Sequence, residues 1–181
     1  MKRFLILICI MFGLINSAHS NYSKLAYDFE FNGIEGDIIK LSKFKDKVIV
    51  VVNVASRCGY TNQYEDLQII WDKYQKKNLI VIGVPTNNFK QEPGSNSQIK
   101  SFCETNFGVN FPMSEKVNVI GKNSHPFYKW AKKNHGLGAI PKWNFHKIII
   151  GKNGKVFDTF ASMTNPTSKK FIKSIEKALE D

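Results

Sequence analysis

Two almost unbroken runs of apolar residues limit most strongly how this chain can fold. They are VIVVVNV at residues 48–54 and LIVIGV at residues 79–84, both rich in β-branched side chains. Such runs are typical of strands that are covered on both faces. Between them, residues 61–77 have the spacing of an amphipathic helix. One face of this helix carries Leu67, Ile70, Trp71 and Tyr74. The segment therefore predicts a βαβ unit in which these side chains, Trp71 included, are core residues against the sheet.

Four shorter segments predict two hairpins, and the first two of them alternate polar and apolar residues. Residues 27–31 (YDFEF) and 37–41 (DIIKL) have glycines between them and predict a half-buried hairpin. We expect this hairpin to form a small lid outside the core. Residues 145–150 (FHKIII) and 156–160 (VFDTF) flank the turn GKNGK and predict a second hairpin.

Helical patterns complete the order of elements. They cover residues 95–107, 124–135 and 167–180, and a loop at residues 85–94, bounded by proline and glycine, precedes the first of them. The order of hairpin, βαβ unit, helices, hairpin and helix predicts an α/β protein with a mixed central sheet flanked by helices. With 181 residues, of which 43% are hydrophobic, the chain can bury one ordinary core, so we expect one domain.

The first twenty residues have the features of a cleaved export signal. Lys2 and Arg3 precede an apolar run at residues 4–15, and small residues follow at 17–20. As a helix this run of twelve residues would span about 18 Å. A bilayer core needs a helix of roughly 20 residues, so an uncleaved anchor is the weaker alternative. We expect residues 1–20 to be removed together with Cys9, leaving an exported domain at residues 21–181, periplasmic or secreted.

The predicted mature chain is basic. The full sequence carries a formal charge of +11, and without the signal 24 basic residues face 15 acidic ones. Its lysines are scattered, with local clusters at residues 40–47 and 129–133 and no nucleic-acid recognition motif among them. We therefore expect a solvated basic surface and no nucleic-acid partner. A weak attraction to anionic lipid headgroups or to an acidic protein stays open.

Cys58 lies in NVASRCGYT, residues 53–61, where a predicted strand passes into a helix that should begin near Thr61 or Asn62. Backbone N–H groups and the helix dipole favour the thiolate form at such a place. Arg57, the only arginine of the predicted mature chain, adds positive charge or is merely solvated. A buried structural cysteine and half of a disulfide are the alternatives.

Neighbouring residues exclude two cysteine motifs. Thr61 stands where a C-x-x-C motif needs its second cysteine, and Ala55 stands where a typical peroxiredoxin motif has threonine. A lone nucleophile therefore remains. The histidines of the predicted mature chain, at positions 125, 135 and 146, lack metal-ligand spacing, so we expect structural roles for them and no metal.

Five motifs in order resemble the glutathione peroxidase family over essentially the whole predicted mature chain. NVASRCGYT resembles the segment around the family's catalytic cysteine or selenocysteine, and NNFKQEPG (residues 87–94) resembles its glutamine loop. FPMSEKV (111–117) and HPFYKW (125–130) follow in family order, and KWNFHK (142–147) resembles the tryptophan-asparagine motif. The resemblance implies a thioredoxin-like fold, with a mixed central sheet, flanking helices and an N-terminal hairpin, and an oxidoreductase that acts as a thiol-dependent peroxidase.

The resemblance also implies the site residues. Cys58 attacks the peroxide and becomes a sulfenic acid, and Gln91, Trp143 and Asn144 supply neutral hydrogen-bond donors for the starting anion and the departing oxygen. Adjacent residues on a regular strand point to opposite faces, so Trp143 and Asn144 must lie in a loop or turn. Cys103 matches the resolving cysteine of the thioredoxin-dependent branch and would form a disulfide with Cys58.

Two positions depart from the family pattern. Only Lys90 separates Phe89 from Gln91, where many members have two residues, which affects how Gln91 faces the thiol. Thr86 stands where other members carry a further cysteine.

The reductant and the oligomeric state follow from two further features. Arg57 alone cannot clamp glutathione as several arginines would, so a thioredoxin-like protein donor is favoured over glutathione. Sixteen residues separate Pro126 from Trp143, whereas tetrameric members have a longer insertion, so we expect a monomer with an open site. Hydrogen peroxide and organic or lipid hydroperoxides are the expected substrates, with no prosthetic group. An exported redox sensor that passes its disulfide to a partner, and a non-enzymatic domain with a structural disulfide, are the competing hypotheses.

Overall fold

The computed structural model describes residues 22–181, so the predicted signal segment and Cys9 lie outside the described residues. The strands are β1 (Glu30–Asn32), β2 (Ile38–Lys40), β3 (Val48–Val54), β4 (Leu79–Pro85), β5 (Lys147–Ile150) and β6 (Val156–Phe160). The α-helices are α1 (Gln63–Tyr74), α2 (Asn96–Phe107), α3 (Pro126–His135) and α4 (Lys169–Glu180). Short 3-10 helices cover Ala26–Asp28, Leu41–Phe44, Gln75–Lys77 and Gly136–Ala139. Every predicted helix and strand is present, with boundaries shifted by a few residues.

The central sheet has the strand order β4-β3-β5-β6. β3 pairs in parallel with β4, from Val48 opposite Leu79 to Val54 opposite Pro85, and α1 connects the two strands. β5 pairs antiparallel with both β3 and β6. The predicted βαβ unit and mixed sheet are confirmed. All seven residues of β3 and all seven of β4 are buried, which explains their almost purely apolar sequences.

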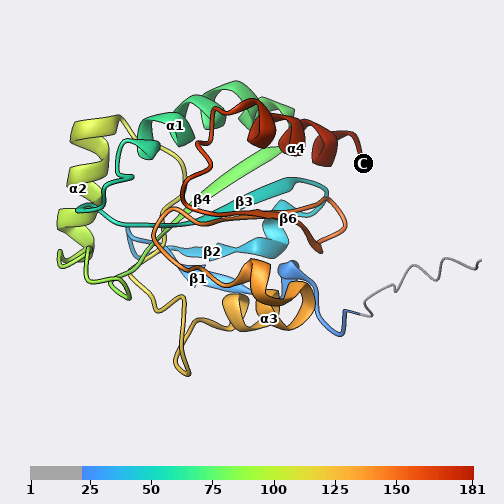
Figure 1. Ribbon diagram of the computed structural model, residues 1–181, viewed down its shortest axis with the longest axis horizontal. Helices are drawn as coiled ribbons and strands as arrows, with labels where there is room; N and C mark the ends of the chain where they lie inside the picture. Colours follow the sequence, from blue (N-terminus) through green and yellow to red (C-terminus); the bar gives the residue numbers. More distant parts are fainter. Residues whose placement is uncertain (1–21) are drawn as a thin grey trace, which may run out of the picture.

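Helices and the N-terminal hairpin cover the two faces of this sheet (Figure 1). α1 and α4 lie together on one face, α3 and the β1–β2 hairpin lie on the other, and α2 stands at one end of the molecule. Each face has its own cluster of buried apolar residues. Within residues 22–181, no helix is long and apolar enough to cross a membrane.

The N-terminal hairpin contributes to the core, so its prediction as a lid outside the core is wrong. Phe31 of β1 and Ile39 of β2 are buried in the same cluster as α3. Phe31 stacks on the ring of His125 at 4.2 Å between centroids and also meets Phe127 at 5.7 Å. The strands are only three residues long, so one buried side chain from each fixes the hairpin to the sheet beneath.

Trp71 also departs from its prediction as a core residue. Leu67, Ile70 and Tyr74 are buried as expected, but Trp71 is only partly buried and packs at the border of both apolar clusters. Its position at the margin of the buried face of α1 leaves part of the indole exposed.

Candidate active site

Cys58 lies in the turn that joins β3 to α1, and its side chain is buried to 8% exposure. Thr61 shapes this turn, because its hydroxyl oxygen accepts the Cys58 N–H at 3.0 Å and lies 2.6 Å from the Cys58 carbonyl oxygen. The Tyr60 N–H donates to the Cys58 Sγ at 3.4 Å. The predicted passage from strand to helix is therefore confirmed, although the α-helix begins at Gln63, after a turn that already gives the sulfur one backbone donor.

Gln91 lies in the loop between β4 and α2, and two hydrogen bonds tie it to the rest of the site. Its carbonyl oxygen accepts the Arg57 N–H at 3.0 Å, which joins the glutamine loop to the residue before Cys58. Its side-chain Oε1 accepts from the Asn144 Nδ2 at 2.8 Å. Because the oxygen of the Gln91 amide is engaged, its NH₂ group is the part left for another partner. Lys90 has a positive φ of 58°, so the short spacing after Phe89 is accommodated by left-handed backbone.

Trp143 and Asn144 lie in the turn before β5, as their adjacency required. Asn53 of β3 holds this turn from both sides: its Nδ2 donates to the Trp143 carbonyl at 3.1 Å, and its carbonyl accepts the Phe145 N–H at 2.6 Å. Asn144 is fully buried, whereas Trp143 is 41% exposed and packs on Phe89, with 5.4 Å between ring centroids. The turn thus sends the amide into the molecule and leaves the indole at the surface.

Glu92 is a supporting residue that the sequence analysis missed. It is 1% exposed, and its Oε2 accepts from the Ser56 N–H at 2.7 Å and the Ser56 hydroxyl at 2.9 Å. Burial raises the pKa of Glu92, and the hydrogen bonds from Ser56 and the charges of Lys116 and Arg57 oppose that rise. The carboxylate therefore braces the Cys58 turn against the glutamine loop. Its only signal in the sequence was its place next to Gln91.

Cys103 lies in the middle of α2 and is 1% exposed. Burial raises the pKa of its thiol to about 11, and the nearby Tyr64 hydroxyl partly offsets that rise. Both Cys58 and Cys103 are free thiols, so the structure contains no structural disulfide between them. Cys103 therefore occupies a buried position in a regular helix.

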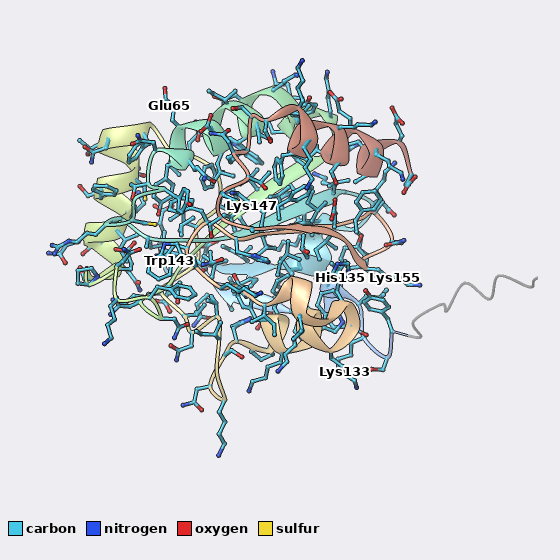
Figure 2. All side chains as sticks on the ribbon, in the orientation of Figure 1. Glu65, Lys133, His135, Trp143, Lys147 and Lys155 are labelled. Atoms are coloured by element: carbon cyan, nitrogen blue, oxygen red, sulfur yellow. The ribbon has the colours of Figure 1, made fainter. Side chains whose placement is uncertain are left out.

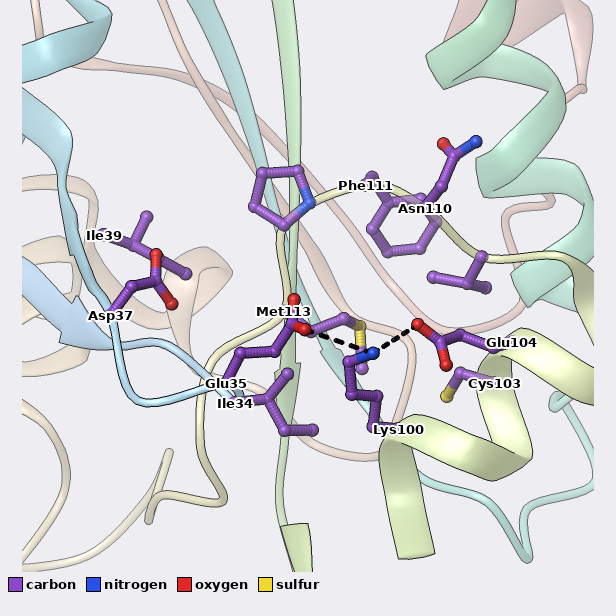
Figure 3. A pocket seen from close by; sticks show the side chains of 12 residues that line it. Ile34, Glu35, Asp37, Ile39, Lys100, Cys103, Glu104, Asn110, Phe111 and Met113 are labelled. Atoms are coloured by element: carbon purple, nitrogen blue, oxygen red, sulfur yellow. Dashed lines mark hydrogen bonds and ion pairs between the residues drawn. The ribbon is translucent and has the colours of Figure 1, made fainter. Parts of the chain in front are cut away.

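A pocket of about 440 Å³ separates α2 from the turn of the N-terminal hairpin, and Cys103 lines it (Figure 3). At its rim the Lys100 Nζ lies 3.2 Å from the Glu35 Oε1 and 2.6 Å from the Glu104 Oε1. Glu35 belongs to the hairpin turn, so this lysine connects α2 to the hairpin. Cys58 is not among the residues that line this pocket.

Lys147 is a second buried charged residue that the sequence analysis did not single out. Its Nζ donates to the Gln63 Oε1 and to the Thr164 carbonyl at 2.6 Å, and Figure 2 shows it in the interior between the sheet and α1. Burial lowers the pKa of Lys147 to about 7, and the charge of Asp66 opposes that effect. Lys147 therefore fastens the start of α1 to the loop after β6. A lysine inside the apolar run FHKIII was the available signal.

The histidines show structural or surface positions. The His125 Nδ1 accepts the Phe127 N–H at 3.3 Å and so caps α3, which confirms a structural role. His146 is buried, and burial lowers its pKa to about 4. His135 is exposed at the end of α3. Across residues 22–181, no three histidine, cysteine, aspartate or glutamate side chains are grouped so that they could hold a metal ion.

Comparison with known proteins identifies the family of this chain. The family model for glutathione peroxidase matches residues 26–132, a range that includes Cys58, Gln91 and Cys103. The chain belongs to the glutathione peroxidase family. Trp143 and Asn144 lie beyond the matched range, and the hydrogen bonds from Asn144 to Gln91 and from Asn53 to Trp143 connect them to it.

Curated relatives extend over most of the chain. It is 44% identical over 147 residues to "Glutathione peroxidase-like peroxiredoxin 2" of Saccharomyces cerevisiae, covering 78% of this chain and 90% of that one. It is 43% identical to "Glutathione peroxidase homolog BsaA" of Bacillus subtilis, covering 85% and 98%. It is 40% identical to "Hydroperoxy fatty acid reductase gpx1" of a Synechocystis strain, covering 84% and 95%. The chain is accordingly a thiol peroxidase, with a hydroperoxide substrate and a thiol reductant.

Solved structures bear out the predicted thioredoxin-like fold. The crystal structure of Trgpx in its apo form has a TM-score of 0.70 at 35% identity, covering 88% of this chain and 97% of that chain. The crystal structure of T. cruzi GPX1 has a TM-score of 0.67 at 30% identity, covering 87% of this chain and 97% of that chain. A thioredoxin family thiol:disulfide interchange protein from Chlorobium tepidum, at 15% identity and a TM-score of 0.62, covers 83% and 92% and is similar in fold alone.

Proposed function

We propose that Cys58 is the thiol that reduces the peroxide. Its thiolate attacks one oxygen of ROOH, the O–O bond breaks, and one proton is taken up, so that Cys58 becomes a sulfenic acid and ROH leaves. The Tyr60 N–H, 3.4 Å from the sulfur, is one donor for the thiolate. The NH₂ groups of Gln91 and Asn144 and the indole N–H of Trp143 are the proposed donors for the oxygen that departs.

The main support for this proposal is the hydrogen bond from the Asn144 Nδ2 to the Gln91 Oε1. It joins two of the proposed donors, which lie 53 positions apart in the sequence, and the Arg57 N–H to Gln91 carbonyl bond joins them to the Cys58 turn. Donors fixed before the reaction lower its barrier without a reorganisation cost, and one such donor is worth about 10² to 10³ in rate at comparable sites.

The proposed second step uses Cys103. The Cys103 thiolate attacks the Cys58 sulfur, the S–O bond breaks as the disulfide forms, and the departing hydroxide takes up one proton and leaves as water. With a pKa of about 11 in its buried position, Cys103 is almost fully protonated near neutral pH. Local opening of α2 would relieve the burial that causes this raised pKa and would bring the thiol into reach.

A thioredoxin-like dithiol protein is the proposed reductant of the disulfide, and glutathione is the alternative. Arg57 is the only arginine within residues 22–181, and its exposed side chain offers a single guanidinium for the two carboxylates of glutathione. The aromatic side chains of Trp143 and of Tyr60, two residues after Cys58, are exposed and so available for contact with a protein donor. We further propose that the protein is a monomer, exported after removal of residues 1–20, so its dithiol donor would be an exported protein too.

Steady-state kinetics test this function. Wild-type protein is given hydrogen peroxide or tert-butyl hydroperoxide, with either reduced thioredoxin or glutathione as donor. We expect turnover with thioredoxin to exceed turnover with glutathione, and both to fall to background in Cys58→Ser. Cys103→Ser should lose thioredoxin-dependent turnover but still consume one equivalent of peroxide. Undiminished turnover of Cys58→Ser would overturn the proposal.

A further inference from the structure

Lys147 is a buried cation with no part in the proposed chemistry. It is the first residue of β5, and its side chain is fully buried. Transfer of an ammonium group out of water is unfavourable unless hydrogen-bond acceptors surround it. An apolar side chain of similar size at such a place is often neutral or stabilising. Fold stability alone therefore does not account for a lysine at this position.

Three acceptors surround the ammonium group of Lys147. It donates to the Gln63 Oε1, to the Thr164 carbonyl at 2.6 Å and to the Ser162 carbonyl at 3.4 Å. The three N–H groups of an ammonium match three acceptors, so no donor is left unused. Gln63 is the first residue of α1, whereas both carbonyls belong to the loop at residues 161–168 between β6 and α4. Lys147 thus connects the sheet to one side chain of α1.

The amide of Gln63 is fixed at both of its polar atoms. Its Oε1 accepts from Lys147, and its Nε2 donates to the Ser162 carbonyl at 2.7 Å. The opposite orientation would place the NH₂ group against the ammonium and the oxygen against a carbonyl oxygen, so the amide has one favourable orientation. Gln63 is only 5% exposed. The first residue of α1 is therefore anchored to the sheet and to the loop at residues 161–168.

The backbone of Gln63 extends these contacts to the sulfur of Cys58. The Gln63 N–H donates to the Tyr60 carbonyl at 2.9 Å and so closes the turn before α1. The N–H of the same Tyr60 donates to the Cys58 Sγ at 3.4 Å. A hydrogen bond weakens steeply as it departs from a linear geometry, so the placement of Tyr60 determines how strongly its N–H binds the sulfur. Lys147, Gln63, Tyr60 and Cys58 thus form one continuous series of contacts.

We infer that Lys147 is a positioning residue for Cys58. It acts through Gln63, which holds Tyr60 so that the Tyr60 N–H faces the Cys58 sulfur. A donor held in this way stabilises the thiolate and is in place before a peroxide arrives. The inference rests on the proposed function of Cys58 for its effect on peroxide reduction, but not for its effect on the reactivity of the thiol itself.

A second contact between α1 and the same loop provides a matched control. The Asp66 Oδ1 accepts from the Thr167 hydroxyl at 2.8 Å, and its Oδ2 accepts from the Asn165 Nδ2 at 2.7 Å. Asp66 lies three residues after Gln63 in α1, and both of these hydrogen bonds are exposed. Thr167→Val removes one of them without a change of charge. It therefore loosens the same joint while the contacts of Lys147 stay intact.

Alkylation of the Cys58 thiol tests the inference without peroxide. Every protein lacks residues 1–20 and carries Cys103→Ser, which leaves Cys58 as its one cysteine. Because the thiolate is the reactive form, the rate with iodoacetamide reports how well the turn stabilises it. Burial lowers the pKa of Lys147 to about 7, so rates are compared at pH 6, where its ammonium form predominates. We expect Lys147→Met to react about three- to tenfold more slowly than its parent, as for the loss of one hydrogen bond.

Two Gln63 variants show whether the effect passes through this residue. Gln63→Leu removes the acceptor for Lys147, so it should slow alkylation as much as Lys147→Met, and the two changes together should slow it no further. Gln63→Glu keeps an acceptor for the lysine and should restore most of the rate. Thr167→Val should react at the rate of the parent, even where it lowers the thermal midpoint. If Lys147→Met does not fold, the contrast between Gln63→Leu and Gln63→Glu decides.

Stopped-flow oxidation of the same proteins by hydrogen peroxide at pH 6 separates the inference from the proposed function. We expect the oxidation rate of Cys58 to fall in Lys147→Met by about the same factor as the alkylation rate. If the parent protein is not oxidised while alkylation slows as expected, the proposed function fails and the positioning role stands. An unchanged alkylation rate in folded Lys147→Met, equal rates in Gln63→Leu and Gln63→Glu, or an equal loss in Thr167→Val would show that the inference is wrong.

Discussion

The two cysteines within residues 22–181 are both buried, yet the protein holds them in opposite ways. Cys58 lies in an irregular turn that Thr61, Glu92 and the Gln91 backbone brace through individual hydrogen bonds. Cys103 lies inside a regular helix, held by the repeating backbone bonds of α2. The Cys58 sulfur already has a backbone donor, the Tyr60 N–H, whereas Cys103 is buried within a helix. With the proposed roles of the two cysteines, peroxide attack and disulfide formation would depend on separate structural elements, which mutation can address one at a time.

The largest effect should come from the donors around Cys58. Asn144→Ala removes both the amide and its hold on Gln91, so we expect the rate of sulfenic acid formation to fall about 10²- to 10³-fold. Stopped-flow measurement of the first oxidation, with reduced protein in excess, reports this step alone. Gln91→Ala should have a comparable effect, and the double variant should lose less than the product of the two, since the residues act as a pair. Asn123→Ala, at an exposed position, is the control. A rate in Asn144→Ala equal to that of the wild type would show that this amide takes no part.

Cys103, the cysteine inside α2, should make the stability of the protein depend on pH. The pKa of Cys103 is about 11 in the folded protein, against 9.0 for the free thiol. The folded state therefore keeps its proton longer than the unfolded state, and the contribution of Cys103 to the free energy of unfolding falls as pH rises from about 9 towards 11, whereas Lys147, whose pKa burial lowers to about 7, contributes in the opposite direction. The loss approaches about 2 to 3 kcal/mol, because each pKa unit corresponds to about 1.4 kcal/mol. Urea unfolding under reducing conditions at several pH values measures it.

The Cys103→Ala variant isolates that effect. It has no titratable thiol at this position, so its decline in stability between pH 9 and 11 should be smaller than that of the wild type. Parallel declines in the two proteins would mean that other groups cause the loss.

A smaller effect should follow from weakening the start of α2. The Ser95 hydroxyl caps this helix by accepting the Gln98 N–H at 3.3 Å, and loss of such a cap costs about 1 kcal/mol. If α2 must open for Cys103 to react, Ser95→Ala should speed disulfide formation up to about fivefold, with peroxide attack at Cys58 unchanged. Hydrogen exchange in α2 should increase in parallel. Ser168→Ala, which removes the corresponding cap of α4, is the matched control. Slower or unchanged disulfide formation in Ser95→Ala would argue against opening of α2 from its N-terminal end.

The smallest effect should come from the exposed ion pair between Lys100 and Glu35. Glu35→Gln removes the charge that links the hairpin turn to α2, while the Lys100 to Glu104 pair within the helix remains. Exposed pairs contribute little to stability, so we expect a rise in the rate of disulfide formation of less than about fivefold, and a smaller rise at high salt. A decrease would show that the hairpin assists the opening of α2.

The sequence predicts most of this fold because its signals are local. Residues 48–54 and 79–84 are apolar on both faces, and that pattern alone specifies covered parallel strands. The hairpin strands at residues 30–32 and 38–40 are present as predicted. Their burial in the core was not predicted, because a three-residue strand carries too few side chains to show which face is covered. Trp71 was misplaced for a similar reason, since periodicity identifies the face of a helix but not where that face ends.

Around the candidate active site, the residues that contact one another across the chain could not be predicted individually. Cys58, Gln91 and Asn144 were found through motifs, whereas Glu92 and Lys147 depend on contacts with Ser56 and Gln63 that only the folded chain brings about. In a sequence, the only signal of a buried charge is an ionisable residue in an apolar segment or a loop. This signal indicates the position but does not identify the partner.

The central claim is that Cys58 reacts in place and Cys103 follows, and time-resolved intact mass measurement tests it most directly. Reduced protein lacking residues 1–20 is mixed with one equivalent of hydroperoxide and quenched in acid. We expect rapid loss of two hydrogens in the wild type, and in Cys103→Ser an equally rapid gain of one oxygen with no loss of hydrogen. An unchanged mass, or a slow gain of oxygen in both proteins, would contradict it, because Cys58 would then not be an activated thiol.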